Sequence, residues 1–224
     1  MNTGPSCADP RHVIARRAAR EVARGQLINL GIGLPTLIPS YLDDPSAAWV
    51  HSENGIVGVG ALAGPDALDS QLIDAGGGYV SVVPGGAIVD SAASFGMIRR
   101  GLVDITFLGA LQVSAHGDLA NWLVPGSLVA GIGGGAELAQ KARRVIVTMP
   151  HVDKRGRPKI VARCTLPLTA RRRVATIITE HAVFACGADG LRLVERLGAL
   201  DVAALRTITE ADFTVDCAVD EGAA

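Results

Sequence analysis

The sequence predicts an α/β fold in which helices flank an open mixed, mostly parallel sheet. Short apolar runs with the character of strands alternate along the chain with segments that have the period of helices. Glycine-rich turns follow several of these runs, as they do where sheet strands end near a ligand. No linker, internal repeat or low-complexity segment divides residues 1–224, so we expect a single domain with loose tails at residues 1–9 and 215–224.

The first third of the chain supplies the first helices and strands. Asp9 is a good N-cap and Pro10 suits the first helical position, so a helix is expected to begin there. An apolar stripe continues to Val22, and Gly25 is the expected stop. Strands are expected at residues 26–30 and 47–50, with a second helix ending near Tyr41.

The rest of the chain continues this alternation. Asp90 can cap a helix over residues 91–100, which Gly101 closes. Residues 84–86 (Pro-Gly-Gly) are expected to form a sharp turn, and residues 112–122 a polar loop of the kind that often carries function. Further strands are expected at residues 72–75, 79–83, 104–108, 144–149, 159–163, 174–179, 182–185 and 191–195, and helices at residues 137–142 and 200–207.

Composition narrows the classes of function. The 224 residues are 49% hydrophobic with a net charge of −1, so the chain can bury a core but offers no basic surface for nucleic acid or an anionic membrane. The four cysteines form no C-x-x-C pair, which argues against a disulfide framework or a zinc site. No apolar run reaches the roughly 18 residues of a membrane span, and the first residues lack the apolar core of a secretion signal. We therefore expect a cytoplasmic protein.

Residues 51–60 are the strongest candidate for chemistry. An apolar strand ends there in Ser52, Glu53 and Asn54, and glycines follow at positions 55, 58 and 60. Glycine lets a second backbone or a ligand approach closely. A glutamate at such a strand end lies at the edge where open α/β sheets place their ligands. The alternative interpretation is that Glu53 only decorates a tight turn.

Other familiar motifs are missing or weak. The sequence contains no G-x-S-x-G, no phosphate-binding G-K-[ST] and no H-E-x-x-H, and its five histidines are scattered. Residues 131–136 approximate a dinucleotide fingerprint but lie in mid-chain and lack an acidic partner at the expected distance. What remains is a carboxylate that can attack an activated acyl group, and glycine loops whose N–H groups can hold an oxyanion.

The chain resembles the beta (B-type) subunit of the class I 3-oxoacid CoA-transferases, which include the succinyl-CoA:acetoacetate and 3-oxoadipate enzymes. The likeness extends over residues 26–213, and joining SENG to GDLANW at this separation is highly specific to that family. The motifs on which this likeness rests are GIGLPT at residues 31–36, SENG at 52–55, LGA, QVS and GDLANW within 104–122, the glycine loop at 131–135 and CTLPLT at 164–169.

The resemblance implies a ping-pong reaction. Glu53 attacks an acyl-CoA such as succinyl-CoA and then carries CoA as a glutamyl-CoA thioester, which a 3-oxoacid (acetoacetate or 3-oxoadipate) accepts. A backbone N–H of the glycine loop, mapping to Gly134, helps to form the oxyanion hole. Residues in the matching motifs are expected to bind CoA or substrate: Asn54, Gly55, Gly33, Gly109, Asn121 and Gly133.

The resemblance also implies that neither a metal nor an organic cofactor is required, since coenzyme A is itself a substrate. It implies a partner, the CoA-transferase alpha (A-type) subunit, whose side chains complete the site. Two alpha and two beta chains are expected to form a heterotetramer.

The chain departs from the family pattern at several positions, which bears on its choice of acid. Gly77 stands where the family usually has lysine, and this favours one alternative, a catalytically idle structural or regulatory subunit of the same fold. An acyl-CoA hydrolase is a second alternative, and a nicotinamide-binding role is a distant third. The other departures are Ala61, the Gly-Ala-Glu at 135–137 and Ala170.

Overall fold

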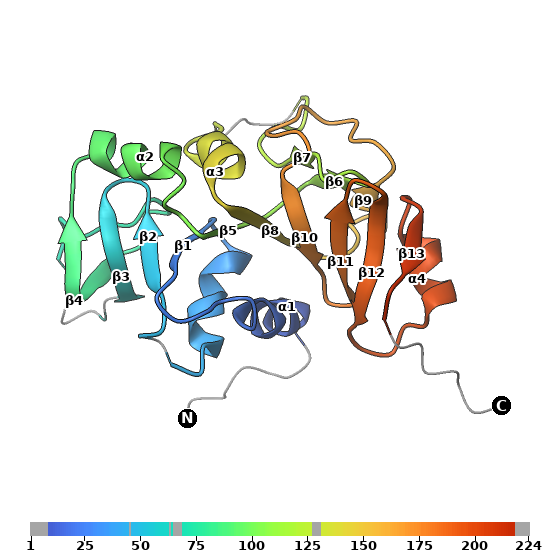
Figure 1. Cartoon of the computed structure of the whole chain (residues 1–224), viewed down its shortest axis with the longest axis horizontal. Coiled ribbons are helices and arrows are strands. Elements are labelled where there is room, and N and C mark those ends of the chain that lie inside the picture. Colours follow the sequence, from blue (N-terminus) through green and yellow to red (C-terminus); the bar gives the residue numbers. More distant parts are fainter. Residues whose placement is uncertain (1–8, 45, 63, 65–68, 127–130, 218–224) are drawn as a thin grey trace. The chain divides into compact units, whose positions relative to one another are not determined.

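The computed structural model describes residues 9–44, 46–62, 64, 69–126 and 131–217 (Figure 1). Contacts group these residues into two compact units. One consists of residues 15–109 and 132–146 within the described ranges, and we call it the Glu53 unit. The remaining described residues form the second, which we call the C-terminal unit.

The Glu53 unit is built on a sheet with the strand order β5-β1-β2-β3-β4. β1 pairs in parallel with both β2 and β5, whereas β3 and β4 continue the sheet in antiparallel fashion. The parallel strands therefore direct their carboxyl ends to one edge of the sheet, where open α/β proteins bind ligands. The strands are β1 (Leu27–Leu30), β2 (Trp49–Ser52), β3 (Ile56–Leu62), β4 (Val80–Ile88) and β5 (Ile105–Leu108).

Two helices of this unit share a small apolar core. α2 (Ser91–Arg99) begins as predicted at Asp90, whose carboxylate accepts a hydrogen bond from the N–H of Ala93 at 2.8 Å. α3 (Gly135–Lys141) packs against α2 and β5. Ile98 of α2 and Leu138 of α3 are both buried in this core, and each such side chain contributes about 1.5–3 kcal/mol by leaving water.

The C-terminal unit contains two smaller groups of strands. One has the order β13-β12-β11-β10, with antiparallel pairs except for the parallel β12–β13 pair; the other has the order β7-β6-β9. α4 (Val202–Ile208) is capped by Asp201, which accepts a hydrogen bond from the N–H of Ala204 at 2.7 Å. The strands are β6 (Gln112–Ser114), β7 (Leu119–Ala120), β9 (Ile160–Val161), β10 (Val174–Ile178), β11 (Ala182–Gly187), β12 (Gly190–Arg196) and β13 (Phe213–Val215).

Two elements have residues in both units, and a third is a 3₁₀ helix. α1 (Pro10–Ala19) and β8 (Arg144–Thr148) each have residues in both units. η1 (Leu34–Tyr41) is a 3₁₀ helix of the Glu53 unit, in place of the helix expected there. α1 ends at Ala19 and not at Gly25, because the next N–H groups bond to carbonyls three residues back in tighter turns.

β4 corrects the predicted turn at residues 84–86. The strand continues through Pro-Gly-Gly to Ile88 and stays paired with β3. The glycines serve a close approach of the two strands: a Cβ atom at Gly58 would lie 3.1 Å from Cα of Gly86. The register shifts between Val57 and Val59, so the glycine run marks an irregularity within a hairpin and not its end.

Three further expectations differ from the structure. The polar segment 112–122 contains β6 and β7, and residues 72–75 form only an isolated bridge, between Ile73 and Tyr79. Val215, assigned to the C-terminal tail, is the last residue of β13, while residues 1–8 and 218–224 of the expected tails lie outside the described residues. The predicted class, an α/β fold with an open mixed sheet and flanking helices, is confirmed. The single domain stays a prediction.

Gly55→Ala is expected to destabilise the Glu53 unit. Gly55 has φ of 129°, which L side chains rarely adopt, and a Cβ atom there would overlap the carbonyl oxygen of Val89. We expect the free energy of unfolding, measured by urea titration, to fall by about 2–4 kcal/mol. Gly77→Ala is the matched control: its φ is 84° but a Cβ atom would meet nothing within 4 Å, so a loss of about 1 kcal/mol is expected. Equal losses would contradict the overlap at Val89.

Candidate active site

Loops that leave the parallel strands bring three of the predicted residues to one edge of the sheet. Gly33 follows β1, Glu53 follows β2 and Gly109 follows β5. The first of these loops is tied to β5, because the N–H of Gly31 donates to the carbonyl of Phe107 at 2.8 Å. These three predicted residues therefore lie at the carboxyl edge of the parallel strands, within the Glu53 unit.

Asn29 holds the carboxylate of Glu53. Its Nδ2 donates to Oε2 of Glu53 at 3.2 Å and to the carbonyl of His51 at 3.1 Å. The amide is oriented in turn by Thr106, whose Oγ1 donates to Oδ1 of Asn29 at 3.3 Å. Asn29 is 1% exposed, so the carboxylate is fixed from the interior of the sheet. Sequence reasoning missed this residue, although an amide in an apolar strand was a signal that could have revealed it.

Gly134 packs directly against the side chain of Glu53. A Cβ atom at position 134 would lie 2.9 Å from Cγ and 3.3 Å from Oε1 of Glu53. It would also lie 3.3 Å from Cζ of Phe95. The two residues named from the sequence as catalytic are thus neighbours, and only glycine leaves room for the carboxylate in this position. Their chemical roles stay predictions.

The residues on either side of Glu53 are clamped by a turn at residues 74–78. Oγ of Ser52 accepts a hydrogen bond from the N–H of Ala75 at 2.8 Å. Nδ2 of Asn54 donates to the carbonyl of Ile73 at 2.6 Å. Glu53 therefore projects from a loop whose backbone is fixed before and after it.

His51 adds no positive charge to this edge. Its Nε2 and the hydroxyl of Ser94 are 2.9 Å apart, and burial lowers the pKa of the imidazole to about 4. The ring is therefore neutral at pH 7. Its Nδ1 is buried and has no hydrogen-bond partner among the described residues.

The remaining predicted residues divide between the two units. Asn54, Gly55 and Gly133 belong with Glu53, and Gly133 has φ of 51°. Asn121 belongs to the C-terminal unit, where its N–H donates to Oγ1 of Thr169 at 3.3 Å and its Oδ1 accepts from that hydroxyl at 2.6 Å. The structure therefore groups every predicted site residue except Asn121 into the Glu53 unit.

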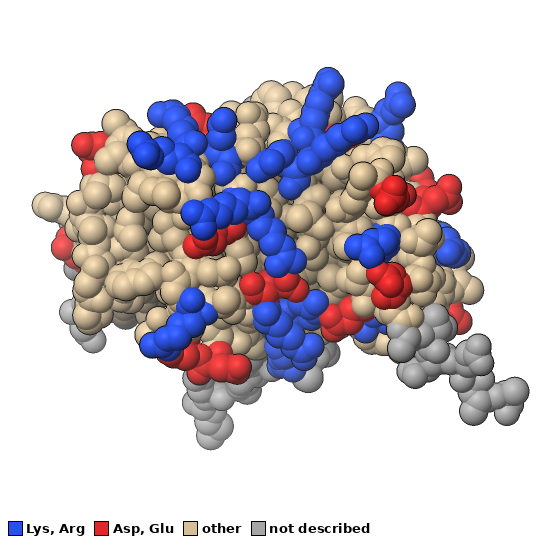
Figure 2. Space-filling view, in the orientation of Figure 1, with Lys and Arg blue, Asp and Glu red and all other residues tan. Residues whose placement is uncertain are grey.

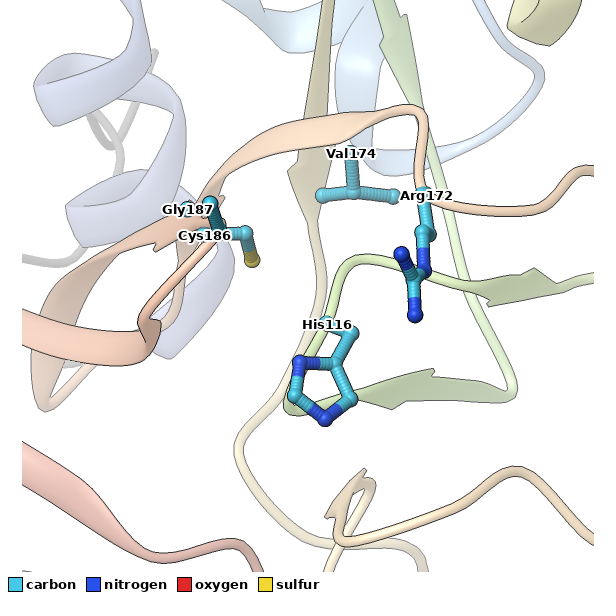
Figure 3. Close-up of a pocket in the computed structure, with 6 residues that line it drawn as sticks. His116, Arg172, Val174, Cys186 and Gly187 are labelled. Atoms are coloured by element: carbon cyan, nitrogen blue, oxygen red, sulfur yellow. The ribbon is translucent and has the colours of Figure 1, made fainter.

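A separate hollow of about 300 Å³ lies in the C-terminal unit (Figure 3). Arg172, with φ of 52°, turns its side chain toward it, and burial raises the pKa of the Cys186 thiol in its wall to about 12. The thiol is consequently a poor nucleophile at neutral pH. None of the predicted site residues line this hollow; its wall is formed by His116, Arg172, Val174, Cys186, Gly187 and Ala188.

The described residues contain no group of three His, Cys, Asp or Glu side chains that could hold a metal ion. In the same ranges, every helix is too short or too polar to cross a membrane. The chemistry that this geometry offers is that of a carboxylate held by an amide beside the backbone of a glycine.

Comparisons with known proteins give a family and several relatives of this chain. A family model described as Coenzyme A transferase matches residues 11–197. The chain is 47% identical over 206 residues to the beta subunit of a probable coenzyme A transferase of Bacillus subtilis (strain 168), covering 92% of this chain and 95% of that one. It is 46% identical over 210 residues to the mitochondrial succinyl-CoA:3-ketoacid coenzyme A transferase 2B of Mus musculus, covering 92% of this chain but only 40% of that protein.

Among solved structures, the chain is similar to an acyl-CoA transferase from Escherichia coli O157:H7, crystallised as a thioester complex with CoA. The TM-score is 0.76 at 20% identity, and the match covers 96% of this chain and 43% of that one. At this identity the likeness concerns the fold alone.

Proposed function

We propose, from the premise that this chain belongs to the coenzyme A transferase family, that it is the beta subunit of a two-subunit 3-oxoacid CoA-transferase. The donor in this proposal is an acyl-CoA such as succinyl-CoA, and the acceptor is acetoacetate or 3-oxoadipate. The observation that supports it most is the Glu53 carboxylate, hydrogen-bonded to Asn29 on one side and packed on Gly134 on the other. The mouse relative, which is named as a succinyl-CoA:3-ketoacid coenzyme A transferase, supports the choice of a 3-oxoacid.

The proposed reaction proceeds in balanced steps. An oxygen of Glu53 attacks the thioester carbon, the C–S bond breaks, and CoA leaves as a thiolate with a mixed anhydride behind it. The thiolate then attacks the Glu53 carbonyl carbon, which releases the free acid and leaves CoA on Glu53 as a thioester. The 3-oxoacid carboxylate repeats these steps in reverse and departs as its CoA thioester. Because the thioester energy is conserved, the proposal needs neither a metal nor an organic cofactor.

The two neighbours of Glu53 have different proposed roles. Asn29 binds Oε2, which leaves Oε1 on the side of Gly134. The backbone N–H of Gly134 then serves the oxyanion that develops during attack, where one such donor is commonly worth about 10²–10³ in kcat. Asn29 acts as a positioning residue, since it holds the nucleophile and not the reacting carbonyl.

Asn29→Ala is expected to lower kcat about 10- to 100-fold because the carboxylate loses the amide that orients it. KM for succinyl-CoA is expected to change by less than about threefold, since Asn29 is buried behind Glu53 and makes no binding contact in this proposal. Steady-state kinetics on the complex with the alpha subunit measure both constants. Thr106→Val, which removes only the hydroxyl that orients Asn29, is expected to give a smaller loss in the same direction. A rise in KM with an unchanged kcat would contradict the positioning role.

Assembly with an alpha subunit is part of the proposal. The Bacillus subtilis relative is named as a beta subunit, and the mouse relative is a longer chain of which this one spans 40%. We propose that the alpha subunit supplies side-chain donors around Glu53, that two chains of each kind form a heterotetramer, and that the enzyme is cytoplasmic. The mass of the co-purified complex, measured by light scattering, tests the stoichiometry.

Trapping of the intermediate is the direct test. The complex with the alpha subunit is incubated with succinyl-CoA and treated with borohydride, which reduces a glutamyl thioester and should inactivate the enzyme. Peptide mass spectrometry is expected to locate the modification at Glu53. Full activity after this treatment, or a modified peptide without residue 53, would refute the proposal. Release of free CoA at the same rate without a 3-oxoacid would instead indicate a hydrolase.

Gly77 is the observation that favours a second candidate, a catalytically idle subunit of the same fold. The family usually has lysine at this position, whereas here a side chain is missing and the space beside the backbone is open. Calorimetric titration of CoA into the complex with the alpha subunit distinguishes the two candidates. The transferase is expected to bind CoA, and the idle subunit is not.

A further inference from the structure

The hollow in the C-terminal unit has a basic side and an apolar side. Arg172 and His116 form the first, and Figure 3 shows the guanidinium of Arg172 extended from the loop before β10 toward the side on which His116 lies. Val174 and Ala188 contribute to the second, together with the thiol of Cys186, which is uncharged at neutral pH because burial raises its pKa to about 12. Apolar walls with a few converging polar groups are typical of small-molecule sites.

The two basic side chains have unused hydrogen-bonding capacity. The backbone N–H groups of Arg172 and His116 donate to Oδ1 of Asp118 at 3.0 Å and to Oγ of Ser114 at 3.3 Å. Within the described ranges, neither the guanidinium of Arg172 nor the imidazole of His116 has a hydrogen-bond or ion-pair partner. A guanidinium carries N–H donors in a fixed fork that matches a carboxylate. The hollow therefore presents free donors and a permanent positive charge to a molecule that enters it.

The backbone that carries these side chains is firmly held. A Cβ atom at Gly117 would lie 2.6 Å from the carbonyl oxygen of Val174, and the carbonyl of Gly117 accepts hydrogen bonds from the N–H groups of Arg173 and Val174 at 3.0 Å each. Arg172 has φ of 52°, and in the described ranges it is the one residue other than glycine with a positive φ. Glycine would avoid this strain. Strain that the surrounding structure maintains at one residue points to a role for its side chain.

The charge around the hollow suits a ligand with a single negative charge. Residues 171–173 are three consecutive exposed arginines, and Figure 2 shows Lys and Arg side chains gathered over the loop that leads into β10. Asp118 offsets part of this charge, because its carboxylate lies against the backbone of Arg172. The volume of about 300 Å³ is at the small end of the range for ligand sites. A small monoanion therefore fits better than a large or multiply charged one.

We propose that the hollow binds a small organic carboxylate. Its carboxylate group accepts hydrogen bonds from the guanidinium of Arg172 and from a ring N–H of His116, and its apolar chain lies on Val174 and Ala188. The lining residues all belong to the C-terminal unit, and none of them has a part in the proposed reaction. This site is therefore additional to the one at Glu53, and the proposal does not depend on CoA transfer.

Hexanoate is the probe, and the ring-proton NMR signals of His116 in the full chain are the measurement; His116→Gln identifies them by their loss. We expect the signals to shift saturably, with a dissociation constant in the millimolar range or below. Arg172→Gln is expected to raise this constant at least about tenfold, because the charge-assisted hydrogen bonds are lost. Arg171→Gln is the matched control: Arg171 is an exposed neighbour that does not line the hollow, so a change below about threefold is expected.

Two further variants separate binding from a role in folding. Arg172→Gly removes the guanidinium and relieves the positive φ, so it is expected to weaken hexanoate binding without lowering the melting temperature. Ala188→Phe places a ring at an exposed position in the wall and is expected to weaken binding with every charge left in place. A lower melting temperature with unchanged affinity in Arg172→Gly would assign this arginine to the fold and overturn the proposal.

A comparison of probes decides the class of ligand. Acetate lacks the apolar chain and is expected to bind at least about tenfold more weakly than hexanoate, and hexylammonium is expected to leave the His116 signals in place. Equal binding of acetate, tighter binding of inorganic phosphate, or unchanged affinity in Arg172→Gln would refute the proposed site. Glu53→Gln is expected to bind hexanoate in the hollow with the affinity of the unmodified chain. The outcome here is therefore independent of the outcome of the transfer assay.

Discussion

Glu53→Gln is expected to reduce CoA transfer by at least about 10³-fold in kcat. The amide has nearly the size of the carboxylate but lacks its negative oxygen, so it attacks a thioester carbon poorly. The measurement is transfer from succinyl-CoA to acetoacetate by the complex with the alpha subunit. The melting temperature is expected to stay within a few degrees, because the amide oxygen of the introduced glutamine can still accept from Nδ2 of Asn29.

Glu137→Gln is the matched control for this loss. Glu137 lies in the first turn of α3, close to Gly134 in sequence, and its Oε1 pairs with Arg99 at 2.7 Å in a partly exposed position. Exposed ion pairs contribute little to stability, and this carboxylate has no proposed part in the chemistry. We expect its kcat within about threefold of the unmodified enzyme. Equal losses in the two variants would show that charge near α3, and not a nucleophile at position 53, controls the rate.

The sequence predicted those parts of the site that depend on a residue and its near neighbours in the chain. Glu53 follows a short apolar run and precedes glycines, so its place at a strand end could be inferred from residue type and spacing. Asp90 as the cap of α2 is of the same kind, since capping depends on a residue and its next three neighbours. Gly134 was identified through resemblance, and the structure adds the reason that glycine is needed: its contact with Glu53.

The parts that the sequence did not predict depend on pairing between distant segments. Asn29 meets Glu53 across 24 positions of the chain because β1 and β2 lie side by side in parallel. The predicted strand ends at residue 83, before the end of β4 at Ile88, because Pro-Gly-Gly favours a turn locally. Its pairing with β3 overrides this preference, and the absence of Cβ atoms at Gly58 and Gly86 lets the two strands approach.

Gly134→Ala is expected to reduce kcat by about 10²-fold or more with little loss of stability. The added Cβ would lie 2.9 Å from Cγ of Glu53, so the flexible side chain must move away from its position on Asn29. The backbone is not strained, because Gly134 has φ of −73°, which alanine adopts readily. The free energy of unfolding is therefore expected to change by less than about 1 kcal/mol. Kinetics of transfer and urea denaturation of the same variant measure the two effects.

Gly135→Ala separates contact with Glu53 from a general effect of alanine in the loop, because a Cβ atom at Gly135 meets nothing within 4 Å. Its kcat is expected within about threefold of the unmodified enzyme. Gly55→Ala is expected to lower the free energy of unfolding instead, because its Cβ atom overlaps the backbone carbonyl of Val89 and not a flexible side chain. Substitution of a glycine that the fold requires lowers the stability of the protein, whereas substitution of one that the reaction requires lowers kcat. If Gly134→Ala lost stability to the same degree as Gly55→Ala, Gly134 would be a structural residue and the oxyanion would need another donor.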